Sequence, residues 1–171
     1  MAICFELVVN FGDDAEAART AALISPKELV LRAGAHRIPL HRPVLSKAES
    51  GIELSVLPVA VSWGCGLDGS IPRFELTAAE LTELGGQLYE LLAQFHGYVA
   101  AKVGWDPESC VDPAELGSEW TDALKEDGIH GLVLCDELHA ELNLSADYDV
   151  FRPGYRWSPY RGEEPGSLTS D

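Results

Sequence analysis

The chain has 171 residues, 46% of them hydrophobic and 23% charged, and its 28 Asp and Glu against 12 Lys and Arg give a formal net charge of −16. These values are typical of one soluble globular domain, and the strong negative charge argues against nucleic acid as a partner. No apolar run approaches the roughly 20 residues of a bilayer-spanning helix, and Glu6 interrupts the apolar start, which lacks the basic residues of a signal peptide. We therefore expect a cytoplasmic protein with no membrane partner.

The charge is unevenly distributed along the chain. Residues 74–149 contain 17 Asp and Glu against only two Lys, a local net charge of −15. Residues 27–47 reverse the balance, with five Lys and Arg against Glu28 alone, a local net charge of +4. Such a field repels nucleic acid and favours a basic protein partner or self-association, although net charge also serves solubility.

The first third of the chain predicts more strand than helix. Residues 2–11 are largely apolar at both alternating sets of positions, which indicates a strand covered on both sides. Asp13 and Glu16 have the spacing of a capping box and predict a short Ala-rich helix. Residues 29–40 predict a hairpin, and the apolar run over 52–63, with Pro58 inside it, predicts a bent or bulged strand.

The clearest predicted element is a helix that begins after Thr77. Thr77 and Glu80 form a second capping box, and leucines over 81–92 recur at the spacing of one helix face. Such a stripe could bind a partner helix, but it is far more typical of a buried core face. The following elements are expected at 98–103 (strand), Asp112 to Gly128 (helix), 131–135 (strand) and 136–144 (helical turns).

This order of elements predicts an α+β fold, a mixed sheet covered by two or three helices. The last strand-helix-strand unit is expected to be a right-handed parallel crossover. We expect a single domain over residues 1–162 and a frayed polar tail over residues 163–171.

The parallel crossover would bring four carboxylates together. Asp106 and Glu108 follow one strand of the unit, and Asp136 and Glu137 follow the other. The carboxyl ends of parallel strands share one sheet edge, where several carboxylates suit Mg²⁺ or Ca²⁺ in a metal-dependent hydrolase or phosphoryl-transfer enzyme. Acids after strands also begin helices, and we favour this interpretation, with no metal and no other cofactor.

The four cysteines do not predict a disulfide framework, since they lie far apart in a chain expected in the cytoplasm. Cys65 lies in the glycine-rich segment SWGCGLDGS, which could expose a nucleophilic thiol. No histidine is linked to Cys65 by a known spacing, so an ordinary turn is the prediction.

The C-terminal segment Tyr148–Arg161 combines aromatic and basic residues in an otherwise acidic protein. Its two prolines, Pro153 and Pro159, argue against a helix or a central strand, so we expect an irregular arm docked on the domain. Candidate binding residues in this arm are Arg152, Tyr155, Arg156, Trp157, Tyr160 and Arg161.

Three roles are open for this arm. It could clasp the C-terminus onto the acidic body, form a platform for a partner or ligand, or stack on nucleobases. The acidic charge disfavours nucleobases, and we predict the clasp. For the whole chain we expect a non-enzymatic interaction domain, inhibitor-like or immunity-like, that binds a basic protein or itself; the metal-dependent enzyme is the alternative.

Overall fold

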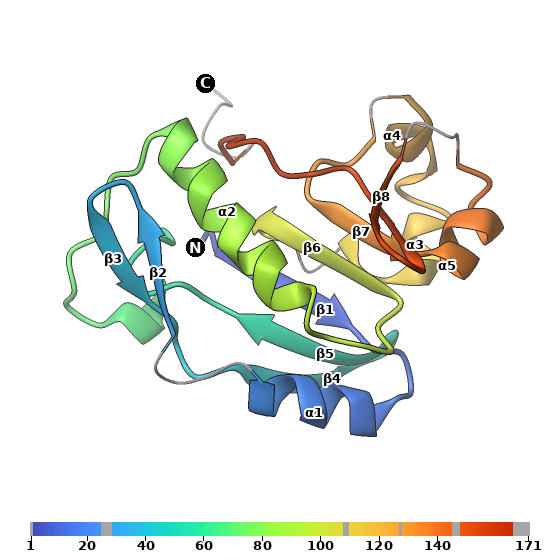
Figure 1. Ribbon diagram of the computed structural model, residues 1–171, viewed down its shortest axis with the longest axis horizontal. Helices are drawn as coiled ribbons and strands as arrows, with labels where there is room; N and C mark the ends of the chain where they lie inside the picture. The colour runs from blue at the N-terminus through green and yellow to red at the C-terminus, as the bar shows by residue number, and fades with distance from the viewer. Residues whose placement is uncertain (1, 25–28, 108–109, 127, 145–147, 166–171) are drawn as a thin grey trace.

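The computed structural model describes residues 2–24, 29–107, 110–126, 128–144 and 148–165. Within these residues, a seven-stranded sheet has the order β4-β5-β1-β6-β7-β9-β8, and β2 and β3 form a separate hairpin (Figure 1). The strands are β1 (Phe5–Asn10), β2 (Val30–Ala33), β3 (His36–Pro39), β4 (Val44–Ala48), β5 (Gly51–Val56), β6 (Ala100–Trp105), β7 (Leu132–Cys135), β8 (Asp149–Arg152) and β9 (Tyr155–Trp157). The helices are α1 (Ala15–Ile24), α2 (Ala78–Leu92), α3 (Pro113–Leu116), α4 (Thr121–Glu126), α5 (Asp136–Glu141) and the short 3₁₀ helix η1 (Gly66–Asp68). The α+β class is confirmed.

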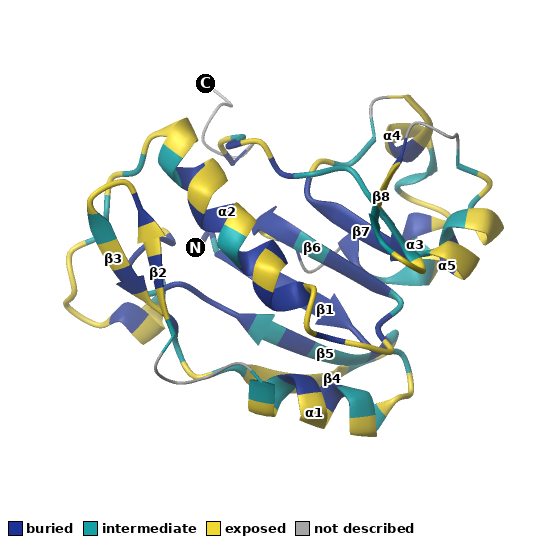
Figure 2. Cartoon of the chain, viewed as in Figure 1, coloured by how far each residue is buried: buried dark blue, intermediate teal, exposed yellow. Residues whose placement is uncertain are grey.

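Strand β1 lies inside the sheet between β5 and β6, and all six of its residues are buried (Figure 2). Phe5, Leu7 and Val9 pack into a core that also contains α1, α2 and the β2–β3 hairpin. Val8 points to the other face, where α3, α4 and α5 form a second core. The prediction of a strand covered on both sides is confirmed.

Helix α2 covers the first face as its sequence predicts. The Thr77 hydroxyl accepts a hydrogen bond from the Glu80 N–H at 3.2 Å, and the Glu80 carboxylate accepts one from the Thr77 N–H at 2.8 Å. Its leucines are buried against the sheet. Helix α1 begins differently from the prediction, because Asp14 rather than Asp13 caps it, accepting a hydrogen bond from the Ala17 N–H at 3.0 Å.

The other face carries three short helices. Asp112 caps α3 by accepting a hydrogen bond from the Ala114 N–H at 2.8 Å, as predicted. The expected single helix is divided in two, because α3 ends at Leu116 and α4 begins only at Thr121. Leu116 and Leu124 both remain in the second core, so the interruption changes the path of the chain without exposing its apolar face.

The predicted mixed sheet and its parallel crossover are wrong, because all strand pairs in the described residues are antiparallel. Strands β6 and β7 are antiparallel neighbours, with Ala100 opposite Leu134 and Lys102 opposite Leu132. In place of one crossover helix, the connection contains the short helices α3 and α4, and the chain enters β7 through Gly131. Gly131 has a φ of 96° and lies so close to the Val103 carbonyl, near the end of β6, that a Cβ would clash there. The chain therefore returns to the sheet end from which it left.

The C-terminal arm is regular rather than irregular. It forms the β8–β9 hairpin around Pro153–Gly154, and β9 pairs with β7 inside the sheet, with Val133 opposite Trp157. Strand β9 has only three residues and fits between the two prolines, so neither proline removes a hydrogen bond from it. Beyond it, Tyr160, Gly162 and Pro165 are buried; residues 166–171 of the expected frayed tail lie outside the described residues.

The expected bent strand over 52–63 ends at Val56, and residues 57–76 form a long connection that contains η1 and is fixed by a few buried contacts. The Asp68 carboxylate is central to this loop: it accepts hydrogen bonds from the Ala60 N–H at 2.8 Å and from His41 Nε2 at 2.6 Å. Ala60 has a φ of 59°, in the region that side chains other than glycine rarely adopt. Asp68 therefore holds a strained turn in place.

We expect Asp68→Ala to lower the free energy of unfolding by about 2–3 kcal/mol, because a buried N–H and a half-buried imidazole lose their acceptor. Urea unfolding followed by circular dichroism measures the loss. Glu75→Ala, in the same loop but exposed and without a described hydrogen bond, is the matched control and should change stability by less than about 0.5 kcal/mol. Equal stability of the two variants would contradict this role of Asp68.

Candidate interaction site

The predicted carboxylate cluster loses its geometric basis in the antiparallel sheet. Asp106 follows β6 at one end of the sheet, and Asp136 and Glu137 follow β7 at the opposite end. Glu108, the fourth predicted ligand, lies outside the described residues. In the described part of the chain, no group of three or more His, Cys, Asp or Glu side chains is arranged to hold a metal ion.

Two of these acids have structural contacts instead. The Asp106 carboxylate accepts a hydrogen bond from the Cys4 N–H at 2.7 Å, and the Asp106 N–H donates to the Cys4 carbonyl at 2.7 Å, which ties the chain terminus to the end of β6. The Asp136 carboxylate lies 3.6 Å from Arg156 Nε. These contacts agree with the interpretation of the acids as structural residues.

Most of the predicted binding residues of the arm face the domain. Arg152 caps the C-terminal end of α2, donating hydrogen bonds to the carbonyls of Ala93 and Phe95 and to His96 Nδ1 at 3.2 Å. Arg156 pairs with Asp136, and only Arg161 of the six is exposed. Arg152 therefore binds carbonyl groups at the end of α2, and Arg156 binds a carboxylate of the domain.

The aromatic residues of the arm close the first core. Tyr155 stacks on Tyr98 with ring centroids 4.1 Å apart, and Trp157 meets Tyr89 edge-on at 4.9 Å. Tyr160 is 5% exposed, and its N–H donates a hydrogen bond to the Tyr89 hydroxyl at 2.9 Å. This packing is the geometry of a clasp, and its use as a platform for a partner stays a prediction without direct support.

Burial controls the titration of these aromatic residues. Desolvation raises the pKa of Tyr89, Tyr98 and Tyr160 well above the usual value, because the tyrosinate form would be charged inside the core. Desolvation likewise raises the pKa of the Cys135 thiol, which makes this cysteine a poor nucleophile. The tyrosines are therefore neutral core residues.

The glycine-rich segment around Cys65 forms a turn, as predicted. Cys65 precedes η1, and its carbonyl accepts a hydrogen bond from the Asp68 N–H at 3.2 Å. Within the described residues the Cys65 thiol makes no hydrogen bond, and the His41 imidazole bonds to Asp68 instead. The base that a cysteine nucleophile requires is therefore not bound to it.

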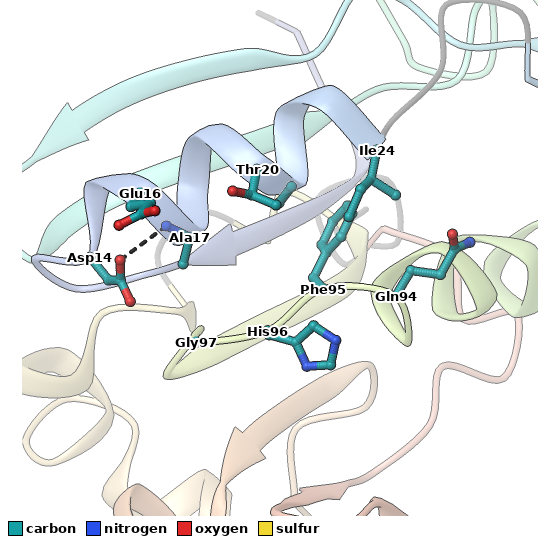
Figure 3. A pocket seen from close by; sticks show the side chains of 10 residues that line it. Asp14, Glu16, Ala17, Thr20, Ile24, Gln94, Phe95, His96 and Gly97 are labelled. Atoms are coloured by element: carbon teal, nitrogen blue, oxygen red, sulfur yellow. Dashed lines mark hydrogen bonds between the residues drawn. The ribbon is translucent and has the colours of Figure 1, made fainter.

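A cleft of about 310 Å³ lies between α1 and the turn that follows α2 (Figure 3). Asp14 and Glu16 lie at one end of it, and Ile24 and Phe95 at the other. Asp14 is the cap of α1, so its position is explained by the helix. A second cleft of about 190 Å³ contains Trp63, but the guanidinium of Arg73 already lies 3.5 Å from the centre of that indole.

The segment that carries the three helices on the second face is strongly acidic. Eight carboxylates on α3, α4, α5 and their connections define what we call the acidic helical face: Asp112, Glu115, Glu119, Asp122, Glu126, Asp136, Glu137 and Glu141. Lys125 is the only Lys or Arg in the sequence from 112 to 141. Within the described residues, the contact between Asp136 and Arg156 is the one ion pair that this face makes.

The basic segment of the sequence lies elsewhere on the molecule. Arg32 and Arg37 are exposed on the β2–β3 hairpin, and Arg42 and Lys47 are exposed after the hairpin and on β4. Figure 1 shows the hairpin and the helices α3, α4 and α5 at opposite ends of the long axis. The arginines of the β2–β3 hairpin therefore lie at the other end of the molecule from the acidic helical face.

A cleft of about 280 Å³, lined by polar as well as apolar residues, lies between α3, α4 and the segment after α5. Leu116 and Leu124 form its buried floor, and Leu142 and Leu144 are partly exposed at its side. Glu141 and Lys125 lie at its rim. One acidic and one basic residue line the cleft, so its lining carries no net charge.

The composition of the chain indicated an acidic surface, but not this cleft. Its residues come from α3, α4 and the segment after α5, and the packing of α3 against Leu142 brings them together. The available signal was the apolar spacing of Leu138, Leu142 and Leu144, which reads equally well as core.

None of the helices in the described residues combines the length and the apolar character that crossing a bilayer requires.

Comparisons with protein-family models, with curated proteins and with solved structures found no match for this chain.

Proposed function

We propose that the chain is a binding protein whose acidic helical face docks on a basic protein partner, as inhibitor and immunity proteins do. The observation that supports this proposal is the set of carboxylates on α3, α4 and α5, which, Asp136 apart, make no ion pair within the described residues. A basic partner would neutralise them, and the long-range field would accelerate its association.

Self-association is the second candidate, since one molecule carries both a basic and an acidic end. The exposed arginines of the β2–β3 hairpin of one copy would then meet the acidic helical face of the next. Such a head-to-tail contact builds rings or filaments rather than two-fold dimers. Sedimentation of the pure protein at low and high salt distinguishes this candidate, because salt weakens it.

The metal-dependent enzyme is no longer the better alternative. It required carboxylates from the ends of β6 and β7 to converge, and Asp106 and Asp136 follow strands that run in opposite directions. No described contact favours catalysis over the structural roles of these two residues.

The proposal is tested by capture from the native lysate with immobilised full-length protein. The test variant neutralises five carboxylates of the acidic helical face: Glu119→Gln, Asp122→Asn, Glu126→Gln, Glu137→Gln and Glu141→Gln. We expect the wild type to retain a basic protein that about 0.5 M salt elutes, and we expect the variant to bind that protein about 100-fold more weakly.

The matched control removes the same number of charges elsewhere. Asp13, Glu16, Glu49, Glu75 and Glu90 are exposed and lie outside the acidic helical face, and their replacement by Asn or Gln should leave the affinity within about threefold. If both variants lose the partner equally, net charge and not this face determines binding. Capture of no basic protein by the wild type would contradict the proposal.

A further inference from the structure

One edge of the seven-stranded sheet is open. Strand β4 is the first strand in the sheet order and pairs on one side only, with β5. Four of its five residues are exposed, and they include the apolar side chains of Val44 and Leu45, which are 47% and 39% exposed. An edge strand of this kind presents N–H and C=O groups with which a further strand can pair.

The register of the β4–β5 hairpin shows which backbone groups of β4 point outwards. Lys47 lies opposite Ile52 of β5. The Ile52 N–H donates to the Gly12 carbonyl at 2.8 Å, and the Ile52 carbonyl accepts from the Phe11 N–H at 2.9 Å, on the side of β5 away from β4. Lys47 and Ile52 are therefore a non-hydrogen-bonded pair, so the N–H and carbonyl of Lys47, and those of Leu45 two residues earlier, point away from β5. These four groups have no partner among the described residues.

Two other strand edges of the molecule carry features that prevent further pairing. In β8, at the opposite edge of the sheet, the register is interrupted between Val150 and Arg152, and such a bulge hinders pairing with another strand. The edge of β2 is covered by Gln87 of α2, which accepts a hydrogen bond from the Arg32 N–H at 2.8 Å and donates one to the Arg32 carbonyl at 2.6 Å. Strand β4 has neither feature within the described residues, and its one protection against pairing is the charge of Lys47.

The outward groups of β4 are complementary to those of a second copy. In an antiparallel pair about a two-fold axis, Ser46 lies opposite Ser46 of the second copy, and Lys47 lies opposite Leu45. Each Leu45 then exchanges two hydrogen bonds with the Lys47 of the other copy, so that all four outward groups of each chain are paired. The two Lys47 ammonium groups are not directly opposite each other, and the stem of each lysine covers the exposed apolar surface of Leu45.

Charge also favours a second copy over a charged partner peptide. Residues 42–53, which contain β4 and the turn after it, have two basic and two acidic residues, and therefore no net charge in a chain whose net charge is −16. A neutral edge does not select a strongly acidic or basic segment. In the two-fold arrangement Arg42 of one copy lies opposite Ser50 of the other and next to Glu49, so opposite charges meet at both ends of the contact.

We propose that β4 pairs with β4 of a second copy, so that two sheets join into one continuous antiparallel sheet across a two-fold axis. The contact is isologous, because one surface meets itself, and it therefore differs from the head-to-tail association of a basic and an acidic end. Helix α5 contacts β7 and β9, at the other side of the sheet, so the acidic helical face of each copy stays free. This inference goes beyond the proposed function and does not depend on it.

Sedimentation equilibrium of the full-length protein tests the association. Two short strands bury less area than a standard interface, so we expect a monomer–dimer equilibrium with a dissociation constant above about 1 µM, measured between about 5 and 500 µM protein. High salt should leave the dimer largely intact, because backbone hydrogen bonds carry it, whereas a head-to-tail contact of charged ends would dissociate. A protein that stays monomeric over this range, or that forms only higher oligomers, overturns the proposal.

Lys47→Pro tests whether the outward backbone groups form the contact. Proline removes the outward N–H and places its ring at the outer edge, a position that edge strands tolerate. We expect the dimer affinity to fall at least about tenfold, while circular dichroism and the urea midpoint of the monomer stay close to those of the wild type. Lys47→Ala keeps the N–H and should dimerise within about threefold of the wild type. Equal losses of affinity in the two variants overturn the backbone contact.

A second pair of variants tests the register and does not depend on the folding of the proline variant. Ser46 is exposed, and residues directly opposite in a non-hydrogen-bonded pair have Cα atoms about 4.5 Å apart, a distance that a disulfide spans. Mild oxidation of Ser46→Cys should therefore convert most of the protein to a covalent dimer on a non-reducing gel. Lys47→Cys, which would face Leu45 of the second copy, should cross-link at least about tenfold more slowly, and the wild type with its four cysteines gives the background. Equal cross-linking of the two variants overturns the two-fold pairing.

Discussion

Deletion of the chain from Asp149 onwards is expected to leave a protein that does not fold. The deletion removes the β8–β9 hairpin and exposes the edge of β7, whose residues Leu132–Leu134 are buried in the intact sheet. It also removes Arg152 from the carbonyls at the end of α2 and Tyr160 from the first core. The loss should exceed about 5 kcal/mol, which is comparable with the whole stability of a small domain.

A single substitution tests how much Tyr160 alone contributes to the stability that the arm provides. Tyr160→Ala should lower the free energy of unfolding by about 3–5 kcal/mol, because it removes a buried aromatic ring that contacts Phe5 at a centroid distance of 5.4 Å. Arg161→Ala is the matched control, since Arg161 is exposed and its side chain makes no described hydrogen bond or ion pair. It should change stability by less than about 0.5 kcal/mol.

Urea unfolding of the two point variants and circular dichroism of the truncated chain measure these effects. A truncated chain that still unfolds cooperatively with nearly native stability would contradict the clasp. If that chain had also lost a partner, the arm would be a docking arm, which was the alternative open from the sequence.

Local sequence signals predicted the elements well because their causes are local. The capping box of Thr77 and Glu80 is formed by residues three positions apart, and the structure contains both of its hydrogen bonds. The Asp112–Pro113 helix start is equally local and is also confirmed. The β8–β9 hairpin also had a local signal, the Pro153–Gly154 turn between two segments rich in aromatic residues. The general argument that two prolines exclude regular structure led instead to the prediction of an irregular arm.

The direction of strand pairing could not be predicted in this way. Whether β6 and β7 run parallel depends on where the connecting segment returns to the sheet, and that depends on the packing of the whole connection rather than on a local signal. The predicted metal site depended on the same strand pairing, since the convergence of Asp106 with Asp136 required parallel strands. The acidic surface was predictable because charge is additive along a sequence, whereas the cleft depends on the contact of α3 with Leu142.

The buried tyrosines predict a steep loss of stability at alkaline pH. Tyr89 and Tyr98 are 6% and 2% exposed, and desolvation raises the pKa of both in the folded protein. In the unfolded chain they ionise near pH 10. The unfolded state therefore releases protons that the folded state retains, so this stabilisation is complete below about pH 10 and is lost as the pH rises above it.

Each of the two tyrosines should reduce the free energy of unfolding by up to about 1.4 kcal/mol per pH unit above about pH 10, so the pair contributes up to about 3 kcal/mol per unit. Tyr160, whose pKa is raised by the same desolvation, acts in the same direction. Urea unfolding between about pH 8 and pH 11 measures the slope, with tyrosinate absorbance recorded in parallel. We expect tyrosinate from these residues to form only as the protein unfolds.

Tyr98→Phe is the matched variant for this experiment, because the buried Tyr98 hydroxyl has no hydrogen-bond partner within the described residues. Its removal leaves the ring stacked on Tyr155 and should be neutral or slightly stabilising near neutral pH. Above about pH 10 the variant should lose stability less steeply than the wild type, by up to about 1.4 kcal/mol per pH unit. Identical slopes, or tyrosinate formed with an ordinary pKa in the folded protein, would show that Tyr98 reaches water and that the β8–β9 hairpin does not seal this edge of the core.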